Sequence, residues 1–191
     1  ISGIPFNKKF ISSIVIIKRS AALVNYKLKL INKDRKDAIV KASDHLMKEN
    51  MEDQFPIDIF QTGSGTSTNM NVNEVLANIA NTFIKDKKNY IHPNGHVNMG
   101  QSSNDVIPTA IHISSLLIVE NKLLPSLNKL SNDLLKKSKK YNKILKIGRT
   151  HLQDATPMTL GQEFSGYYQT IKNNLNQINA SKKILSYLLQ G

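Results

Sequence analysis

Three runs of small hydroxyl, amide and imidazole side chains carry the residues of this chain that could do chemistry. The first spans 61–71, the second spans 92–98 and continues over 101–105, and the third spans 148–154. Each run precedes an apolar pattern of helical period, where free backbone N–H groups and the positive end of the helix dipole favour an anion. The three runs together therefore predict one shared site for a small, multiply charged anion.

The first run combines backbone freedom with an unusual density of hydrogen-bonding side chains. Gly63 and Gly65 allow the backbone to approach a ligand closely. Five polar residues stand ahead of the predicted helix, namely Ser64, Thr66, Ser67, Thr68 and Asn69. A helix cap needs only one such residue, so the pattern favours ligand binding over capping alone. The Gly-Lys-Ser/Thr ending of a P-loop is absent from this run.

The second run contains two separate signals. Residues 102–105, Ser-Ser-Asn-Asp, all suit a helix N-cap, and taken alone they support capping and anion binding equally. His92 and His96 have a spacing that could bind a metal on a helix, but Pro93 and Gly95 between them argue against a helix. The glutamate of a zinc-protease motif is also missing, so we expect a loop or an anion-binding role there.

His151 in the third run is the candidate acid or base. It lies in a polar connection predicted over 141–155, and an imidazole can carry a proton near neutral pH. A structural, hydrogen-bonded histidine is the alternative. His45 and His112 fall within helical patterns and are expected to be ordinary surface or packed residues.

Composition excludes several classes of function. The 191 residues include no cysteine, which excludes disulfides, thiolate zinc sites and a cysteine nucleophile. The net charge is +12, but the lysines are spread over helix faces and arginine is scarce, so solvated lysines are favoured over a nucleic-acid surface. No apolar run approaches the ~20 residues that span a bilayer, so no membrane partner is expected.

Helical periodicity dominates the pattern, and no strands are expected. Helices are predicted over 8–31, 34–48, 69–85, 103–140 and from Thr156-Pro157 to the end. An apolar stripe at helical spacing marks the third of them, namely Val72, Val75, Leu76, Ile79, Ala80 and Phe83. Pro125 should kink or split the fourth of them. The last two helices cannot bury their apolar stripes alone and need further chain or other subunits. The chain lacks an initial Met and ends inside an apolar pattern, so we expect a piece of a longer protein.

These motifs resemble class II fumarase, of the fumarase/aspartase superfamily. The resemblance is carried by QTGSGTSTNMNVNEV from Gln61, HPNGHVN from His92, QSSND from Gln101 and GRTHLQDATPMTLGQEFSGY from Gly148. It covers essentially the whole chain. It implies an all-α fold, with part of an N-terminal lyase domain over 1–101 and the start of a central helical bundle over 102–191.

The resemblance implies the reversible hydration of fumarate to L-malate, in the tricarboxylic acid cycle, without a cofactor or metal. Removal of the C3 proton of malate gives an aci-carboxylate, from which hydroxide leaves C2. Thr150 would hold a carboxylate, and His151 would orient or protonate the water or leaving group. The residues expected to contact substrate are Ser64, Gly65, Thr66, Ser102, Ser103 and Asn104. A secondary anion site would comprise His92, Pro93, Asn94 and Gly95.

Two departures from the family pattern qualify the implied site. The family usually has Asp where this chain has Gly95, which would weaken the secondary site. The family's catalytic serine, on a mobile Gly-Ser-Ser loop with downstream Lys and Asn ligands, would lie beyond Gly191. The family also assembles each active site from three subunits of a homotetramer. The isolated chain is therefore expected to be inactive, and its parent to be a cytoplasmic homo-oligomer that binds a small dicarboxylate.

Two alternatives remain open at this point. Aspartate ammonia-lyases typically have Gln where this chain has His151, and Gly-Gly-Ala-Gly-Thr where it has residues 62–66, so His151 and Ser64 favour fumarase. A non-catalytic helical remnant, which only associates with subunits, is the second alternative.

Overall fold

A computed structural model describes residues 2–49, 52–61 and 63–189. The chain forms helices and one small sheet, which agrees with the predicted all-α class apart from that sheet. The chain divides into two compact units. Unit 1 holds the described residues of 1–115 and 187–191, and unit 2 holds Leu116–Ser186.

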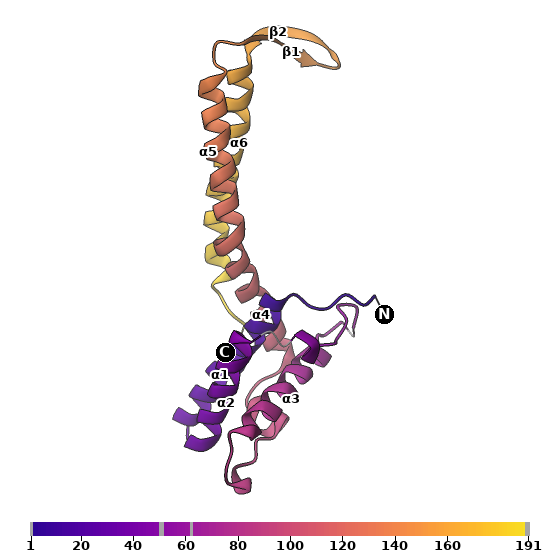
Figure 1. The fold of residues 1–191 in the computed structure, drawn as a ribbon, viewed down its shortest axis with the longest axis vertical. Coiled ribbons are helices and arrows are strands. Elements are labelled where there is room, and N and C mark those ends of the chain that lie inside the picture. Colours follow the sequence, from indigo (N-terminus) through magenta and orange to yellow (C-terminus); the bar gives the residue numbers. More distant parts are fainter. Residues whose placement is uncertain (1, 50–51, 62, 190–191) are drawn as a thin grey trace. The chain divides into compact units, whose positions relative to one another are not determined.

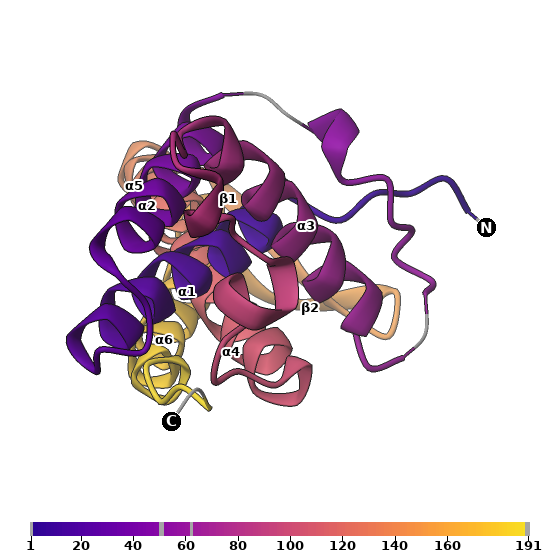
Figure 2. The ribbon, with the colours of Figure 1, turned by 90° about the horizontal axis from the view of Figure 1, so that it is seen from below.

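The core of unit 1 lies between its first three long helices, which Figure 2 shows packed together. They are α1 (Lys8–Lys27), α2 (Lys33–Lys48) and α3 (Thr66–Thr82), and α4 (Ser103–Ile118) follows them. The predicted stripe of α3 is buried at Val72, Leu76 and Ala80. Three short helical turns complete the unit, namely η1 (Glu52–Gln54), η2 (Lys87–Asn89) and η3 (Pro93–Val97).

Unit 2 is a helical hairpin that carries a β-hairpin. Figure 1 shows α5 (Leu124–Lys140) and α6 (Leu160–Leu185) side by side, with β1 (Leu145–Thr150) and β2 (Gln153–Thr159) at one end. A π-helical turn, η4 (Val119–Leu123), interrupts the predicted long helix just before Pro125. Proline lacks the N–H that would continue the hydrogen-bond ladder, and the α-helical pattern is interrupted there as expected, although the backbone stays helical from Ile118 through Leu124 and the helix is not split.

The absence of strands was predicted wrongly. Residues 141–155 are not merely a polar connection, because β1 pairs antiparallel with β2 from Leu145 opposite Thr159 to Thr150 opposite Gln153. The two turn residues, His151 and Leu152, have φ of 49° and 62°. Such a two-residue turn with both φ positive matches the twist of a hairpin, but it is normally signalled by Asn-Gly or Asp-Gly. Neither dipeptide occurs here, so the sequence signal was weak.

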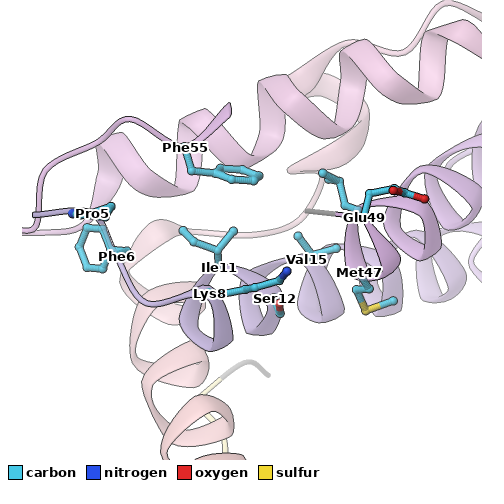
Figure 3. A pocket seen from close by; sticks show the side chains of 10 residues that line it. Pro5, Phe6, Lys8, Ile11, Ser12, Val15, Met47, Glu49 and Phe55 are labelled. Atoms are coloured by element: carbon cyan, nitrogen blue, oxygen red, sulfur yellow. The ribbon is translucent and has the colours of Figure 1, made fainter. Parts of the chain in front are cut away.

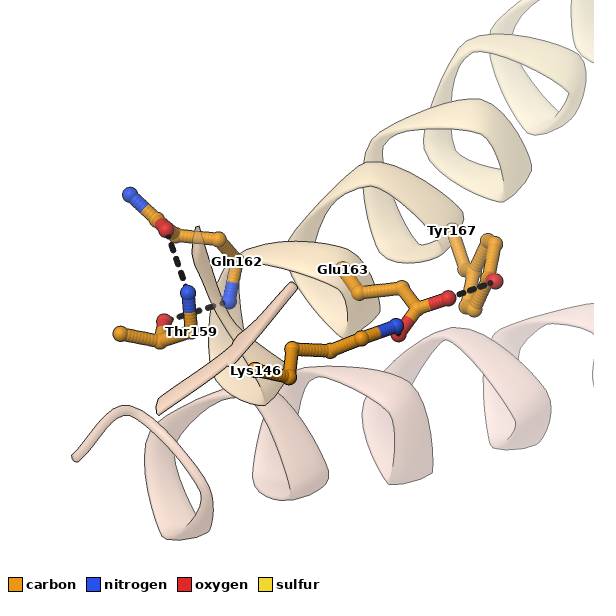
Figure 4. Close-up of polar contacts among 5 residues, drawn as sticks. All are labelled: Lys146, Thr159, Gln162, Glu163 and Tyr167. Atoms are coloured by element: carbon orange, nitrogen blue, oxygen red, sulfur yellow. Dashed lines mark hydrogen bonds and ion pairs between the residues drawn. The ribbon is translucent and has the colours of Figure 1, made fainter. Parts of the chain in front are cut away.

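The predicted start of the last helix was also wrong. Thr156 and Pro157 lie in β2, and α6 begins at Leu160 with Thr159 as its N-cap. Figure 4 shows the reciprocal bonds of the cap: Thr159 N–H donates to Gln162 Oε1 at 2.8 Å, and Gln162 N–H donates to Thr159 Oγ1 at 3.1 Å. The Thr-x-x-Gln spacing of this capping box was the better signal.

Unit 2 has almost no core of its own. Among its described hydrophobic residues, only Leu175 is buried. The continuous helix from Ser103 to Lys140 contains a window long and apolar enough, by length and composition alone, to cross a membrane. The expectation that no such segment exists was therefore too strict. A helix from the centre of a bundle has the same composition, because its apolar face is covered by neighbouring helices.

Figure 3 shows a cavity in unit 1 between α1, the end of α2 and Phe55. Phe6, Ile11, Val15 and Phe55 give it a mainly apolar lining. None of the residues predicted to bind substrate lines it. The predicted chemistry must therefore be sought elsewhere in the chain.

Candidate active site

Three hydroxyl groups meet where the amino ends of α3 and α4 come together. Ser64 Oγ lies 2.9 Å from Thr66 Oγ1, and Thr66 Oγ1 lies 3.1 Å from Ser103 Oγ. Ser64 and Thr66 are exposed in the chain. Two hydrogen bonds among three hydroxyls use two protons, so one O–H remains to donate to a ligand. The structure thus brings together residues from the first two predicted runs.

Gly65 makes this meeting possible. It is the N-cap of α3 in the left-handed conformation, at φ 67°, and as a glycine it has no side chain of its own to cap the helix. A β-carbon at this position would lie 2.9 Å from Ile107 Cγ1 in α4. Glycine is therefore required both for the backbone conformation and for the close approach of α3 to α4. The backbone freedom predicted from the sequence is confirmed at Gly65.

Gln61 fixes the other side of the same loop. Its Oε1 accepts from Thr68 N–H at 3.2 Å, and its Nε2 donates to Thr68 Oγ1. Gln61, Gly63, Gly65 and Thr68 also line a cavity together with Ile107 of α4. The loop before α3 is consequently tied back onto the first turn of its own helix.

Ser102 is the residue that caps α4. Its Oγ accepts from Asn104 N–H at 3.2 Å, and its carbonyl accepts from Val106 N–H at 3.0 Å. The capping interpretation therefore holds for Ser102, whereas the Ser103 hydroxyl points to Thr66 instead. Ser102 and Asn104 are exposed. Capping and an exposed polar surface occur together at this helix end.

Thr150 and His151 lie in unit 2, at the end of β1 and in the hairpin turn. Both side chains are exposed in this chain. Arg149 stabilises the turn, since its Nη2 donates to Leu152 O at 3.0 Å and its Nη1 lies 3.5 Å from Asp154 Oδ1. Positive φ costs energy at residues other than glycine, so the turn that presents His151 is strained and needs such support.

An ion pair joins the hairpin to α6, as Figure 4 shows. Lys146 Nζ of β1 donates to Glu163 Oε2 at 2.5 Å, and Tyr167 Oη donates to Glu163 Oε1 at 2.8 Å. The hydrogen bonds from Lys146 and Tyr167 lower the pKa of Glu163. The bond to Glu163 raises the pKa of Tyr167. None of these three residues was predicted to have a role, although Lys146 lies just before the third run and Glu163 and Tyr167 lie within the motif that begins at Gly148.

The predicted secondary anion site lies on η3. His92, Pro93, Asn94 and Gly95 form or precede this π-helical turn, so the expectation of a plain loop was wrong. His92 Nδ1 accepts from the N–H groups of Asn94 and Gly95, at 3.2 and 3.0 Å. The imidazole thereby caps the turn, because the N–H groups at a helix start have no partner within the helix.

The second histidine of this turn supports the first. His96 Nδ1 accepts from His92 N–H at 2.8 Å. Burial, together with the charges of Arg35 and His92, lowers the pKa of His96. Both Nδ1 atoms are thus engaged with the backbone. In the part of the chain that the structure describes, no three His, Asp or Glu side chains cluster as a metal site would require.

Comparison with known proteins finds a lyase family model and relatives named fumarate hydratase. A family model described as "Lyase" matches residues 4–191. Class II fumarate hydratase of Halobacterium salinarum is 47% identical over 100% of this chain and 41% of its own length. Mitochondrial fumarate hydratase of Saccharomyces cerevisiae is 48% identical over 92% of this chain and 36% of its own length. The chain therefore spans about two fifths of the curated relatives it matches.

A solved structure extends the similarity to three dimensions. The crystal structure of class II fumarase from Schistosoma mansoni superposes with a TM-score of 0.91 and 42% identity. The match covers 98% of this chain and 40% of that one.

Proposed function

The chain belongs to the lyase family, and we propose that it is part of a class II fumarate hydratase. The matching family model and the solved fumarase structure confirm the family resemblance that was inferred from the motifs. The proposed reaction is the reversible hydration of fumarate to L-malate, a step of the tricarboxylic acid cycle. The observation that carries the proposal is the chain of hydroxyls from Ser64 through Thr66 to Ser103, at two helix amino ends.

This arrangement suits a dicarboxylate whose charge grows during reaction. Abstraction of the C3 proton of malate concentrates negative charge on one carboxylate, and hydroxide then leaves C2. Fixed O–H and N–H donors that already point at that carboxylate stabilise the charge without rearranging. Ser64, Gly65 and Thr66 offer such donors at α3, and the exposed Ser102 and Asn104 offer more at α4.

The remaining roles are proposed by residue. Ser103 contributes its hydroxyl to the same surface, Thr150 holds a substrate carboxylate, and His151 orients or protonates the water or leaving group. His92, Pro93, Asn94 and Gly95 bind a second anion weakly, because Gly95 brings no side chain to it. The reaction is proposed to need neither metal nor cofactor. The catalytic base is proposed to come from sequence outside these 191 residues.

The proposed assembly follows from the sparse core of unit 2. A helical pair in which Leu175 is the only buried hydrophobic residue described needs partner helices to cover its apolar faces. We propose a homotetramer, with a domain over 1–101 followed by a central bundle that begins at 102. The proposed location is the cytoplasm, and an organelle is the alternative. No nucleic-acid or membrane partner is proposed.

Substrate-dependent formation of fumarate tests the reaction. The polypeptide encoded by the whole gene is incubated separately with L-malate and with L-aspartate, and fumarate is followed by its ultraviolet absorbance. Fumarate from malate alone supports the proposal, whereas fumarate and ammonia from aspartate identify an aspartate ammonia-lyase. Product from neither substrate, with a helical and defined oligomer by circular dichroism and light scattering, identifies a non-catalytic remnant.

The candidate acid or base is tested in the same assay. His151→Gln is expected to lower the rate by about 100-fold or more, the usual contribution of a positioned proton carrier. His45→Gln is the matched control, because His45 is an exposed histidine of α2 outside the three runs. The isolated 191-residue chain is expected to show no turnover.

A further inference from the structure

We propose that Lys18 is a positioning residue that acts through Asn98 to hold Ser102, Ser103 and Asn104 against the amino end of α3. The ligand for this surface rests on the proposed function, whereas the positioning rests on unit 1 alone. Nothing in the three polar runs pointed to Lys18, which lies in the apolar pattern of α1. Its spacing from Ile14 and Ala22 was the available signal, because it falls on the same helix face.

Lys18 is fully buried, with a relative exposure of 0%. Ile14, Ile17 and Ala22 of the same helix are buried as well. Burying an ammonium group costs free energy unless hydrogen bonds compensate it, and an apolar side chain would pack here without that cost. This desolvation also lowers the pKa of Lys18 to about 7. A lysine at such a position therefore calls for a specific partner.

That partner is the side chain of Asn98, which directly follows η3. Lys18 Nζ donates to Asn98 Oδ1 at 2.7 Å, and Asn69 Nδ2 of α3 donates to the same oxygen at 3.3 Å. A single amide oxygen thus accepts one bond from α1 and one from α3. The lysine and the first turn of α3 are connected through Asn98.

The other end of Asn98 reaches the segment before α4. Asn98 Nδ2 donates to Gln101 O at 3.1 Å, and Gln101 N–H donates back to Asn98 O at 3.1 Å. Asn25 of α1 adds a bond from Nδ2 to Met99 O at 3.1 Å. Residues 98–101 are consequently held from α1 at Lys18 and at Asn25.

Ser102 follows this segment directly, so the position of 98–101 sets the position of the polar surface. The Thr66–Ser103 contact tolerates only tenths of an ångström before the hydrogen bond weakens. Asn69 lies one turn after Thr66, so the Asn98 side chain reaches the Thr66 side of that contact through Oδ1 and the Ser103 side through the bond from Nδ2 to Gln101 O. Lys18 therefore controls how the amino ends of α3 and α4 are aligned, although it belongs to neither helix.

Hydrogen exchange on the polypeptide encoded by the whole gene, measured without any ligand, tests the positioning. Lys18→Met and Asn98→Ala are each expected to speed amide exchange over 102–106 and 66–69 by about tenfold relative to the rest of unit 1. Leu46→Ala is the matched control, because it removes a buried side chain of α2 and should speed exchange throughout the unit. A Lys18→Met pattern like that of Leu46→Ala, or an unchanged pattern, would overturn the proposal.

A double variant tests whether Lys18 acts through Asn98. The combined change Lys18→Met with Asn98→Ala is expected to speed local exchange no more than the larger single change does, because both interrupt one path. Multiplicative effects would show that the residues act separately and would contradict the proposed route. Asn98→Ala also keeps the test valid if Lys18→Met fails to fold.

A kinetic measurement separates this inference from the proposed function. In the polypeptide encoded by the whole gene, Lys18→Met is expected to raise the KM for fumarate about tenfold while kcat falls less. An unchanged KM alongside faster local exchange would count against this surface as the fumarate site, but not against the positioning. Unchanged local exchange would overturn the positioning, whatever the KM, and would leave the proposed function to the assay with malate and aspartate.

Discussion

Thr66 Oγ1 and Ser103 Oγ lie 3.1 Å apart although 37 residues separate them in sequence. The contact joins the amino ends of two helices, each of which leaves backbone N–H groups without partners inside the helix. With Ser64 it forms a row of hydroxyls that retains one proton for a ligand. The two polar runs found in the sequence thereby become one donor surface.

Removing the central hydroxyl should weaken substrate binding more than stability. Thr66→Val keeps the shape but loses both side-chain hydrogen bonds, and we expect about tenfold weaker fumarate binding by the whole-gene polypeptide. Calorimetric titration measures the affinity. Thr82→Val, at the opposite end of α3 and also exposed, is the control. Equal affinities in the two variants would remove Thr66 from the site.

Replacing each of the two glycines of the first run should have sharply different effects on the free energy of unfolding. Gly65→Ala places a β-carbon at positive φ and 2.9 Å from Ile107, and we expect a loss of about 1–3 kcal/mol in the free energy of unfolding. Gly63→Ala meets nothing within 4 Å and should change stability by less than about 0.5 kcal/mol. Urea unfolding followed by circular dichroism compares them. A similar loss in both variants would contradict the packing argument.

Gly161 permits the close approach of α6 to the end of α5. A β-carbon there would lie 2.5 Å from the backbone of Ser138 and Asn142, which cannot rotate away, so Gly161→Ala should cost about 3 kcal/mol. Gly166→Ala in the same helix meets nothing within 4 Å and should stabilise unit 2 by up to about 1 kcal/mol. The midpoint of thermal unfolding should therefore fall in Gly161→Ala and rise in Gly166→Ala.

The Lys146–Glu163–Tyr167 contacts should make the hairpin sensitive to acid. Because the pKa of Glu163 is lowered in the folded chain, its contribution to stability is present above the unfolded pKa and is lost as pH falls through the folded one. Glu163→Gln should abolish this dependence. Nuclear magnetic resonance of labelled tyrosine rings should then show the raised pKa of Tyr167 returning towards its ordinary value.

A second ion pair of the same unit supplies the control for that experiment. Glu120 Oε1 lies 3.1 Å from Lys182 Nζ. Glu120→Gln should leave the titration of Tyr167 unchanged, because no hydrogen bond of Tyr167 involves Glu120. A shift of Tyr167 in this variant would show that general charge, rather than the bond to Glu163, controls its pKa.

Lys18→Met should change how stability depends on alkaline pH. The folded pKa of about 7 lies below the unfolded value near 10.4, so between them the unfolded chain binds more protons and the wild type gains stability as pH rises. The stability of the wild type relative to that of Lys18→Met should therefore rise over that window. Lys9→Met, at an exposed position of α1, should show no such trend. Parallel pH profiles for all three proteins would refute it.

Local sequence patterns determined much of the fold. The spacing of Val72, Leu76 and Ala80 predicted the buried face of α3, and Pro125 predicted the interruption at η4. These features depend on residues within one or two helical turns of one another, so short-range periodicity is enough to read them. The start of α6 was missed because Thr156-Pro157 gave a competing signal, although Thr159 and Gln162 carried the correct one.

The sequence by itself determined the polar runs, the family and the candidate residues, because each of these is written in consecutive side chains. Only the tertiary structure decided that Thr66 meets Ser103, that His151 occupies a strained hairpin turn, and that Lys18 is buried against Asn98. Such contacts join segments distant along the chain. Their geometry depends on how helices pack, which the periodicity of each helix alone does not specify.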